Sequence, residues 1–394
     1  MKAGWQTKNL GDVCNVIGGG TPSKDKAAFY SGDIPWATVR DLKQEVITST
    51  EFKITKEAVK SSSTNIIPSG NVVIATRVGL GKICLLGQDT AINQDLRGII
   101  PFNAKTLDVR FLFWWLKSIA DLIVAEGTGA TVQGVKLPFV KSLQVPLPPL
   151  PEQQRIVGIL DSAFDGIATA KAIAEKNLQN ARALFESHLQ SVFTQRGEGW
   201  KQKTLDEIAT NFGRGKSRHR PRNEKKLYGG KYPFIQTGDI RNAEHFITEY
   251  SQTYSEAGLA QSKLWPKGTI CITIAANIAE TGILGFDACF PDSVIGVVTN
   301  PAEADVDFVE YLLQSFKARI QALGKGSAQA NINMGTFENE RFPFPSVAEQ
   351  KRIVAKLDAL SEETQRLESL YQRKLAALDE LKKSLLHQTF NGEL

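Results

Sequence analysis

One segment of this sequence occurs twice. PLPPLPEQQRIVGILD (146–161) returns as PFPSVAEQKRIVAKLD (343–358), with nine identical residues at a constant offset of 197 positions. Chance does not produce such a match, so the chain contains an internal duplication. The copies follow each other in the order globular half, helix, globular half, helix.

Weaker matches keep nearly the same offset. YSGDIPWATVRDL (30–42) corresponds to YGGKYPFIQTGDI (228–240). The second half opens with RGEGW (196–200), much as the first opens with AGW (3–5). The repeat therefore predicts two similar units related by a pseudo-two-fold axis, with the chain termini close together.

Each copy of the repeated motif opens a predicted long helix. Residues 151–193 have apolar side chains at helical spacing and no proline after the first turn. About 42 residues would give a helix of ~60 Å, longer than a small domain, so we expect the two helices to pair as an antiparallel coiled coil. Two unrelated surface helices are the alternative. The second helix has the clearer seam, in alternating steps of four and three: Ile353, Leu357, Leu360, Thr364, Leu367, Tyr371, Lys374, Leu378, Leu381 and Leu385.

The globular halves have the pattern of an α+β fold rich in strands. Runs such as NVVIAT (71–76) and TICITIA (269–275) are separated by Gly, Pro and Asn turns. One helix is expected in each half, around 108–121 and 305–323. The predicted domains are 1–150 and 197–347, separated by long-helix regions at 151–196 and 348–394.

Composition excludes several classes of protein. The chain is 42% hydrophobic and 23% charged, so it can bury a core. A run of 18 apolar residues, which a membrane-spanning helix needs, does not occur, and the N-terminal residues lack a signal-peptide core. The four cysteines have no CxxC spacing, which argues against a disulfide framework or a zinc site and favours reduced thiols in the cytoplasm. They are Cys14, Cys84, Cys271 and Cys289.

Catalytic motifs are missing. Gly215-Lys216-Ser217 resembles the end of a P-loop, but Thr210 stands where the first glycine is required. Asp292 suggests a nuclease carboxylate, yet no Glu-x-Lys follows it at a suitable interval. The methyltransferase tetrapeptide of Asn or Asp, two prolines and an aromatic residue is also absent. We therefore expect no catalysis by this chain alone.

Positive charge is concentrated in two places. The net charge is +5, and residues 1–150 alone carry 17 basic against 12 acidic residues. The segment GRGKSRHRPRNEKK (213–226) holds seven basic residues and one acid, which favours a polyanion contact over a merely solvated loop. At the same place in the first half stands GGGTPSKDK (18–26), whose glycines would let backbone amides approach phosphate.

Candidate DNA-binding residues lie in these loops and in nearby turns. Arg, Lys, Asn and Gln are the residue types that read base edges, although each one singly is more often an ordinary surface residue. Arg97 and Asn331 occupy similar turns. The candidates are Thr21, Ser23, Lys24, Arg40, Arg77, Lys82, Gln94, Arg214, Lys216, Arg218, Arg220, Arg222, Gln236, Arg241, Asn277, Lys325 and Gln329.

The combined pattern resembles the specificity subunit of type I restriction–modification enzymes. The match covers essentially the whole chain in order. It is carried by GGTPSK (19–24), SGDIPWATVRDL (31–42), INQDLRGI (92–99), both copies of the repeated helix-opening motif and LLHQTFNGEL (385–394).

This resemblance implies two target-recognition domains, each reading one half of a bipartite, asymmetric DNA site, with the helices setting the gap. It implies a subunit without enzymatic activity and without a bound cofactor or metal. Its partners would be DNA, two modification subunits that use S-adenosylmethionine to methylate adenine, and two restriction subunits that use ATP and Mg²⁺. The long basic loop of the second half departs from the first half's TPSK segment, so base contacts cannot be carried from one half to the other.

Two other classes remain open. A coiled-coil adaptor for proteins would need exposed apolar patches on its globular halves and would not respond to DNA. A stand-alone nuclease or methyltransferase would need the missing motifs.

Overall fold

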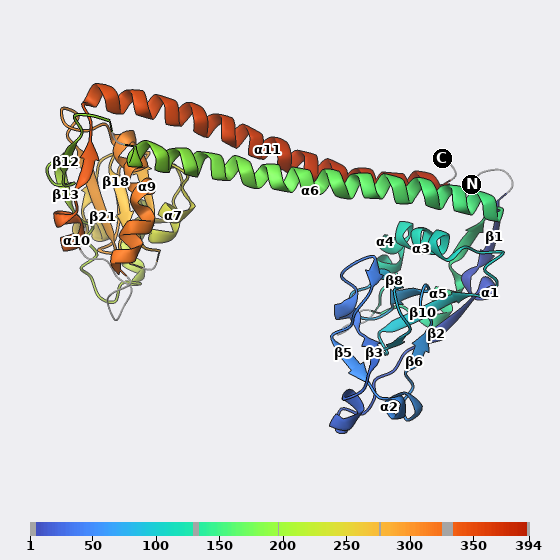
Figure 1. The fold of residues 1–394 in the computed structure, drawn as a ribbon. Helices are drawn as coiled ribbons and strands as arrows, with labels where there is room; N and C mark the ends of the chain where they lie inside the picture. Colours follow the sequence, from blue (N-terminus) through green and yellow to red (C-terminus); the bar gives the residue numbers. More distant parts are fainter. Residues whose placement is uncertain (1–4, 129–133, 196, 276, 325–333, 392–394) are drawn as a thin grey trace. The chain divides into compact units, whose positions relative to one another are not determined.

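The computed structural model describes residues 5–128, 134–195, 197–275, 277–324 and 334–391. The chain divides into two compact units (Figure 1). Unit 1 comprises Met1–Glu175 and Arg373–Leu394, and unit 2 comprises Lys176–Gln372. Each unit therefore combines one globular domain with parts of both long helices, α6 (Leu150–Thr194) and α11 (Val347–Asn391).

Unit 1 contains a five-stranded sheet, a four-stranded sheet and a two-stranded ribbon. The first has the order β2 (Cys14–Gly18), β10 (Leu96–Pro101), β7 (Val72–Ala75), β8 (Ile83–Leu86) and β4 (Val46–Ile47). The second has the order β5 (Phe52–Ile54), β3 (Ile34–Ala37), β9 (Thr90–Ile92) and β6 (Asn65–Ile67). The ribbon pairs β1 (Gln6–Asn9) with β11 (Gln144–Leu147).

Unit 2 repeats this topology strand for strand. Its five-stranded sheet has the order β13 (Ala209–Arg214), β21 (Val294–Thr299), β18 (Ile270–Thr273), β19 (Thr281–Leu284) and β15 (Phe246–Ile247). Its four-stranded sheet has the order β16 (Gln252–Tyr254), β14 (Tyr228–Phe234), β20 (Ala288–Cys289) and β17 (Leu264–Trp265). The ribbon pairs β12 (Lys201–Lys203) with β22 (Phe342–Phe344). The predicted duplication and the α+β class are confirmed.

Shorter helices connect the strands. Unit 1 has α1 (Leu10–Val13), η1 (Ala27–Tyr30), η2 (Val39–Asp41), α2 (Lys56–Lys60), α3 (Val109–Ser118), α4 (Ala120–Ala125) and α5 (Leu137–Ser142). Unit 2 has η3 (Lys225–Leu227), α7 (Thr237–Asn242), α8 (Glu256–Ala260), α9 (Val306–Gly324) and α10 (Met334–Asn339). The helices expected around 108–121 and 305–323 correspond to α3 with α4 and to α9.

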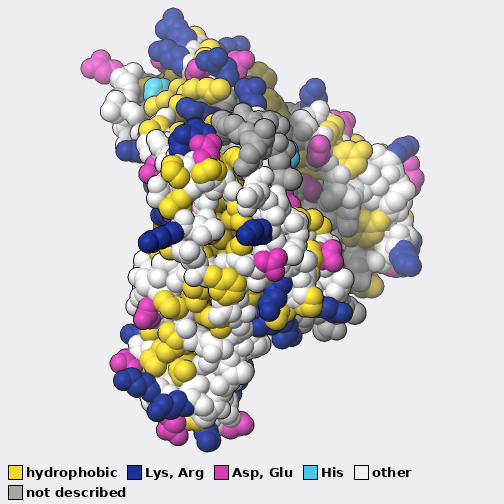
Figure 2. Space-filling model, turned by 90° about the vertical axis from the view of Figure 1, so that its right-hand side faces the viewer, with side chains coloured by type: hydrophobic (Ala, Val, Ile, Leu, Met, Phe, Trp, Pro, Cys, Tyr) yellow, Lys and Arg dark blue, Asp and Glu magenta, His cyan; other side chains and the backbone are white. Residues whose placement is uncertain are grey.

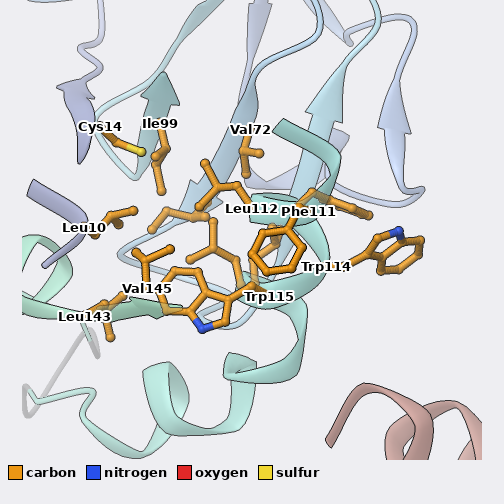
Figure 3. Close-up of a cluster of buried hydrophobic side chains, with 14 of the residues drawn as sticks. Leu10, Cys14, Val72, Ile99, Phe111, Leu112, Trp114, Trp115, Leu143 and Val145 are labelled. Carbon is orange, nitrogen blue, oxygen red and sulfur yellow. The ribbon is translucent and has the colours of Figure 1, made fainter. Parts of the chain in front are cut away.

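The core of unit 1 forms around α3 (Figure 3). Asp108 begins this helix by accepting hydrogen bonds from the backbone N–H groups of Arg110 and Phe111. Every residue from Phe111 to Leu116 is buried, because α3 packs between the five-stranded sheet and the long helices. Burying so many aromatic rings is the main stabilising contribution of this domain.

Both long helices close against their domains through equivalent aromatic contacts. Phe390 of α11 packs on Phe111 with ring centroids 5.4 Å apart, and Phe193 of α6 packs on Phe308 at the same distance. Trp5 belongs to the same apolar cluster as Phe390, so the first and last described segments meet in unit 1, as predicted. The outermost residues of both termini lie outside the described ranges.

Within each unit the two long helices run antiparallel. In unit 1, Lys382 lies over Phe164 and Lys171 bonds Asp379 at 2.6 Å, so one helix ascends while the other descends. In unit 2, Arg182 bonds Glu368 at 2.8 Å. The expected antiparallel coiled coil is confirmed.

The predicted seam of α11 is wrong at alternate positions in its second half. Lys374 is exposed and Leu381 is 46% exposed, whereas Leu375 and Lys382 are half-buried. The face of α11 is set by the domain as well as by α6, because Lys382 also forms an ion pair with Glu45 at 2.9 Å. At these two positions the inward face is therefore turned by one residue relative to the strict 4-3 pattern.

Among the described residues, no helix combines the length and apolar character that crossing a membrane requires. All four cysteines are buried and free. Burial raises the pKa of the Cys14 thiol to about 12, so this thiol stays protonated and unreactive.

Candidate nucleic-acid interface

Four loops of unit 1 meet at one end of its sheets. They follow β2, β3, β7 and β9, and backbone hydrogen bonds tie them together. Gly20 N–H donates to the Ile92 carbonyl at 3.0 Å, Asn93 N–H to the Ala37 carbonyl at 3.0 Å, and Thr76 N–H to the Asp95 carbonyl at 2.8 Å. The fold thus gathers candidates from distant parts of the sequence at one surface: Thr21, Ser23, Lys24, Arg40, Arg77, Lys82 and Gln94.

Contacts among these side chains hold part of this surface in place. Thr21 donates from its hydroxyl to the side-chain oxygen of Gln94. Arg77 lies 3.7 Å from Asp95, and Arg40 lies 3.6 Å from Glu51. Both arginines remain largely exposed, so they can still reach a phosphate or a base edge.

Glycines in the first loop serve close packing. A Cβ on Gly19 would overlap the backbone oxygen of Asn93, and one on Gly20 would overlap Ser63. The amide of Gly20 is already bonded to Ile92, so it does not point freely at a phosphate as the sequence suggested. A Cβ on Gly18 would overlap the guanidinium of Arg97, which lies opposite it on β10.

The corresponding end of unit 2 carries the basic loop. Arg214, the last residue of β13, donates from Nε to the Asp292 carbonyl at 2.7 Å. Arg222 donates from Nη2 to both carboxylate oxygens of Asp292, at 3.0 and 2.9 Å. Arg220 folds back onto the carbonyls of Ser217 and His219, whereas Lys216 and Arg218 are exposed.

A polar hollow of about 320 Å³ opens beside this loop. Gln236, the N-cap residue of α7, contributes to its wall, so the fold brings this candidate to Arg222. Its lining combines hydrogen-bonding side chains with aromatic rings: Ser217, Arg222, Asn223, Tyr228, Phe234, Gln236, Thr237, Gln252, Pro291 and Ser293.

Other candidates of unit 2 are placed differently. Arg241 is exposed on α7 but does not line the hollow. Asn277 is half-buried, and its carbonyl accepts a hydrogen bond from the Thr273 hydroxyl. Lys325, Gln329 and Asn331 lie outside the described residues.

Charges of both signs share the face in Figure 2. Lys and Arg side chains lie there between Asp and Glu, with hydrophobic side chains among them. On this face, therefore, positive charge is spread over separate points. Such a surface favours individual polar contacts over binding by bulk attraction.

The largest hollow, about 760 Å³, has the wrong charge for DNA. It lies in unit 2 beside α7, and carboxylates line it, among them Asp239, Glu244, Glu249 and Glu362. These groups would repel phosphates. The loop end of the sheets remains the better candidate for a nucleic-acid interface.

A family model for the type I restriction modification DNA specificity domain matches residues 2–177 and 197–375. The two matches together span most of the chain, one in each repeat. The chain belongs to this family.

Curated relatives of the family resemble this member over different lengths. The MjaIX specificity subunit from Methanocaldococcus jannaschii is 24% identical over 99% of this chain and 93% of its own length. The EcoR124I/EcoR124II specificity subunit from Escherichia coli is 35% identical, over 41% of each chain.

Solved structures share the fold of this family member. A chain from a type I R-M system, in a structure about complex assembly and conformational transition, superposes with a TM-score of 0.81 at 21% identity, covering 100% of this chain and 99% of the other. The HsdS subunit from Thermoanaerobacter tengcongensis gives 0.68 at 20% identity, with coverage of 100% and 98%.

Sequence reasoning missed several residues at the interface of this specificity-domain protein. Asp292 was weighed only as a nuclease carboxylate, yet it binds Arg222 and Arg214. Tyr228 and Asn223 also line the hollow. One signal was available for Asp292: both repeats place an aspartate in the turn before the second strand of the five-stranded sheet, and Asp95 of unit 1 likewise contacts an arginine.

Proposed function

We propose that this chain is the DNA-specificity subunit of a type I restriction–modification complex. Each domain would read one half of a bipartite, asymmetric DNA site. One observation carries the proposal: the two units share their strand order, while the loops at the same end of the sheets differ in chemistry. Equal frameworks with unequal loops suit two different half-sites.

The chemistry of these loops supports DNA as the ligand. Exposed basic side chains such as Arg40, Lys216 and Arg218 would neutralise phosphates and supply affinity. Gln94, Gln236 and Arg222 can donate to base edges, which is how sequence is read in the major groove.

DNA and the other subunits of the complex are the partners that family membership supports. Two modification subunits would dock on the long helices, and two restriction subunits would join them. Exposed apolar side chains on these helices favour such docking: Ile159, Ile173, Leu184, Leu370 and Leu381. A coiled-coil adaptor would use the same side chains, but it would leave the polar loop ends without a role.

The chain itself would carry no catalytic centre and bind no cofactor. S-adenosylmethionine, ATP and Mg²⁺ would be used by the partner subunits. We place the complex in the cytoplasm, where its DNA is found.

Mapping of methylated adenines by long-read sequencing tests this function. Cells would carry this chain with its cognate modification subunit, and control cells would carry the modification subunit alone. A bipartite motif with two unlike halves and a fixed gap is expected only with this chain. Identical methylation in both strains would reject the proposal, and binding of protein partners with no effect of DNA would favour the adaptor.

A further inference from the structure

Asp292 has an unusual position for an acidic residue. It lies in the turn between β20 and β21, at the end of unit 2 that carries the basic loop. Phosphates approaching this surface would be repelled by its carboxylate. An acid at this place therefore opposes binding, unless its contacts contribute something else.

Its hydrogen bonds within the described residues are with arginines of the proposed interface. The carboxylate accepts two hydrogen bonds from Nη2 of Arg222, and the backbone carbonyl accepts one from Nε of Arg214 at 2.7 Å. One residue thus fixes two guanidinium groups that come from different segments, the end of β13 and the basic loop.

Stability does not explain this ion pair. Arg222 is 50% exposed and Asp292 is 40% exposed, and ion pairs at such exposure contribute little to folding. What the pair does is remove rotamer freedom from a long side chain, which lowers the entropic cost of a later contact.

The orientation of Arg222 is further defined by its backbone. Tyr228 donates from its hydroxyl to the Arg222 carbonyl at 2.7 Å, so both ends of this residue are held. Arg222 lies in the wall of the 320 Å³ hollow together with Gln236 and Gln252. Because both bonds to Asp292 leave from Nη2, the Nε and Nη1 groups have no partner within the described part of the chain.

We propose that Asp292 is a positioning residue that orients Arg222 to read one base edge in the half-site of the second domain. This rests on the proposed function. Asp292 would act through Arg222, and its effect would be on sequence selection more than on affinity.

The repeat offers an independent parallel. In unit 1, Asp95 lies 3.7 Å from Arg77, and its neighbour Gln94 accepts from Thr21 of the first loop. In both units, therefore, the turn before the second strand of the five-stranded sheet contacts polar residues of the candidate interface.

The test compares Asp292→Asn with the unchanged chain, each in complex with the cognate modification subunit. Loss of a negative charge at a DNA surface by itself raises affinity for every sequence. A positioning role predicts the opposite for selectivity: the ratio of cognate to non-cognate binding falls by roughly tenfold, because an oriented arginine contact is lost. In cells, the methylation motif should become degenerate in one half only, so the other half serves as an internal control.

Two further variants complete the design. Glu249→Gln removes one exposed carboxylate of the same domain away from the basic loop, and it should leave the motif unchanged. Arg222→Gln breaks the same pair from its other side and should relax the same half-site. This variant keeps the test decisive if Asp292→Asn does not fold.

The outcomes are distinguishable. An unchanged motif with folded Asp292→Asn and Arg222→Gln proteins would overturn the positioning role while leaving the proposed function intact. Equal degeneracy in both halves would also overturn it. Absence of any motif with the unchanged chain would instead reject the proposed function.

Discussion

The side-chain oxygen of Gln153 accepts a hydrogen bond from the backbone N–H of Asp108 at 2.8 Å. Its side-chain N–H group donates to the carbonyls of Thr106 and Pro148. Gln350 makes the equivalent bond to Asp305 at 2.8 Å, 197 positions later. A fully buried glutamine thus couples the first turn of each long helix to the helix of its own domain.

We predict that Gln153→Ala lowers the free energy of unfolding by about 2–3 kcal/mol, because buried backbone groups lose their partner. Gln350→Ala should have a similar effect in unit 2. Denaturant unfolding of the purified chain measures this. Gln154 is the exposed neighbour, and Gln154→Ala should stay within about 0.5 kcal/mol of the unchanged protein.

His245 joins the second domain to α9 through an ion-pair cluster. It lies 2.7 Å from the carboxylate of Glu310, which is fully buried, and 3.0 Å from that of Asp307. Its ring stacks on Tyr311. Thr281 and Gln314 also donate to Glu310. Burial lowers the pKa of His245, but hydrogen bonds to Asp307 and Glu310 outweigh it and raise the pKa to about 9.

This raised pKa predicts a pH-dependent stability. A folded-state pKa of about 9, against 6.5 for the free side chain, gives a contribution that is complete below pH 6.5 and is lost as the pH rises through 9. The loss should be on the order of 3 kcal/mol at most. Unfolding curves of the chain at pH 6, 8 and 9.5 would detect it.

His245→Gln should remove that pH dependence, whereas His188→Gln, an exposed histidine on α6, should keep it. If all three proteins lose the same stability between pH 6 and 9.5, the cluster is not the cause.

Salt dependence reports the phosphate contacts of the basic loop. Replacing Arg218, Arg220 and Arg222 together by alanine should weaken DNA binding and lower the slope of log affinity against log salt by up to about three contacts' worth. A filter-binding titration between low and moderate salt measures the slope. Unchanged slopes would mean that these arginines do not reach phosphates.

Two hairpin turns solve the same backbone problem with different residues. Gly81 has φ = +81° two residues before β8, and Ala279 has φ = +63° two residues before β19. Ala279→Gly should raise stability by up to about 1 kcal/mol, because a side chain is costly in this conformation. Gly81→Ala should destabilise, since its Cβ would lie 2.8 Å from Val124. Thermal unfolding of both variants checks the opposite signs.

Sequence alone determined the large-scale design of this protein. The duplication, the α+β class, the two long helices and the strands at 71–76 and 269–275 could all be predicted, because periodicity and repetition are local properties of a chain. The family resemblance came from the same repeated segments. The basic loop was visible because its charges are contiguous in sequence.

Tertiary structure decided what the side chains do. The loops that carry Thr21, Gln94 and Arg77 meet only because strands far apart in sequence pair in one order. The contacts of Asp292 with Arg222 and of His245 with Glu310 join residues 70 and 65 positions apart. The inward face of α11 depended on Glu45 as well as on α6. Such pairings arise from packing between distant segments, and no local pattern encodes them.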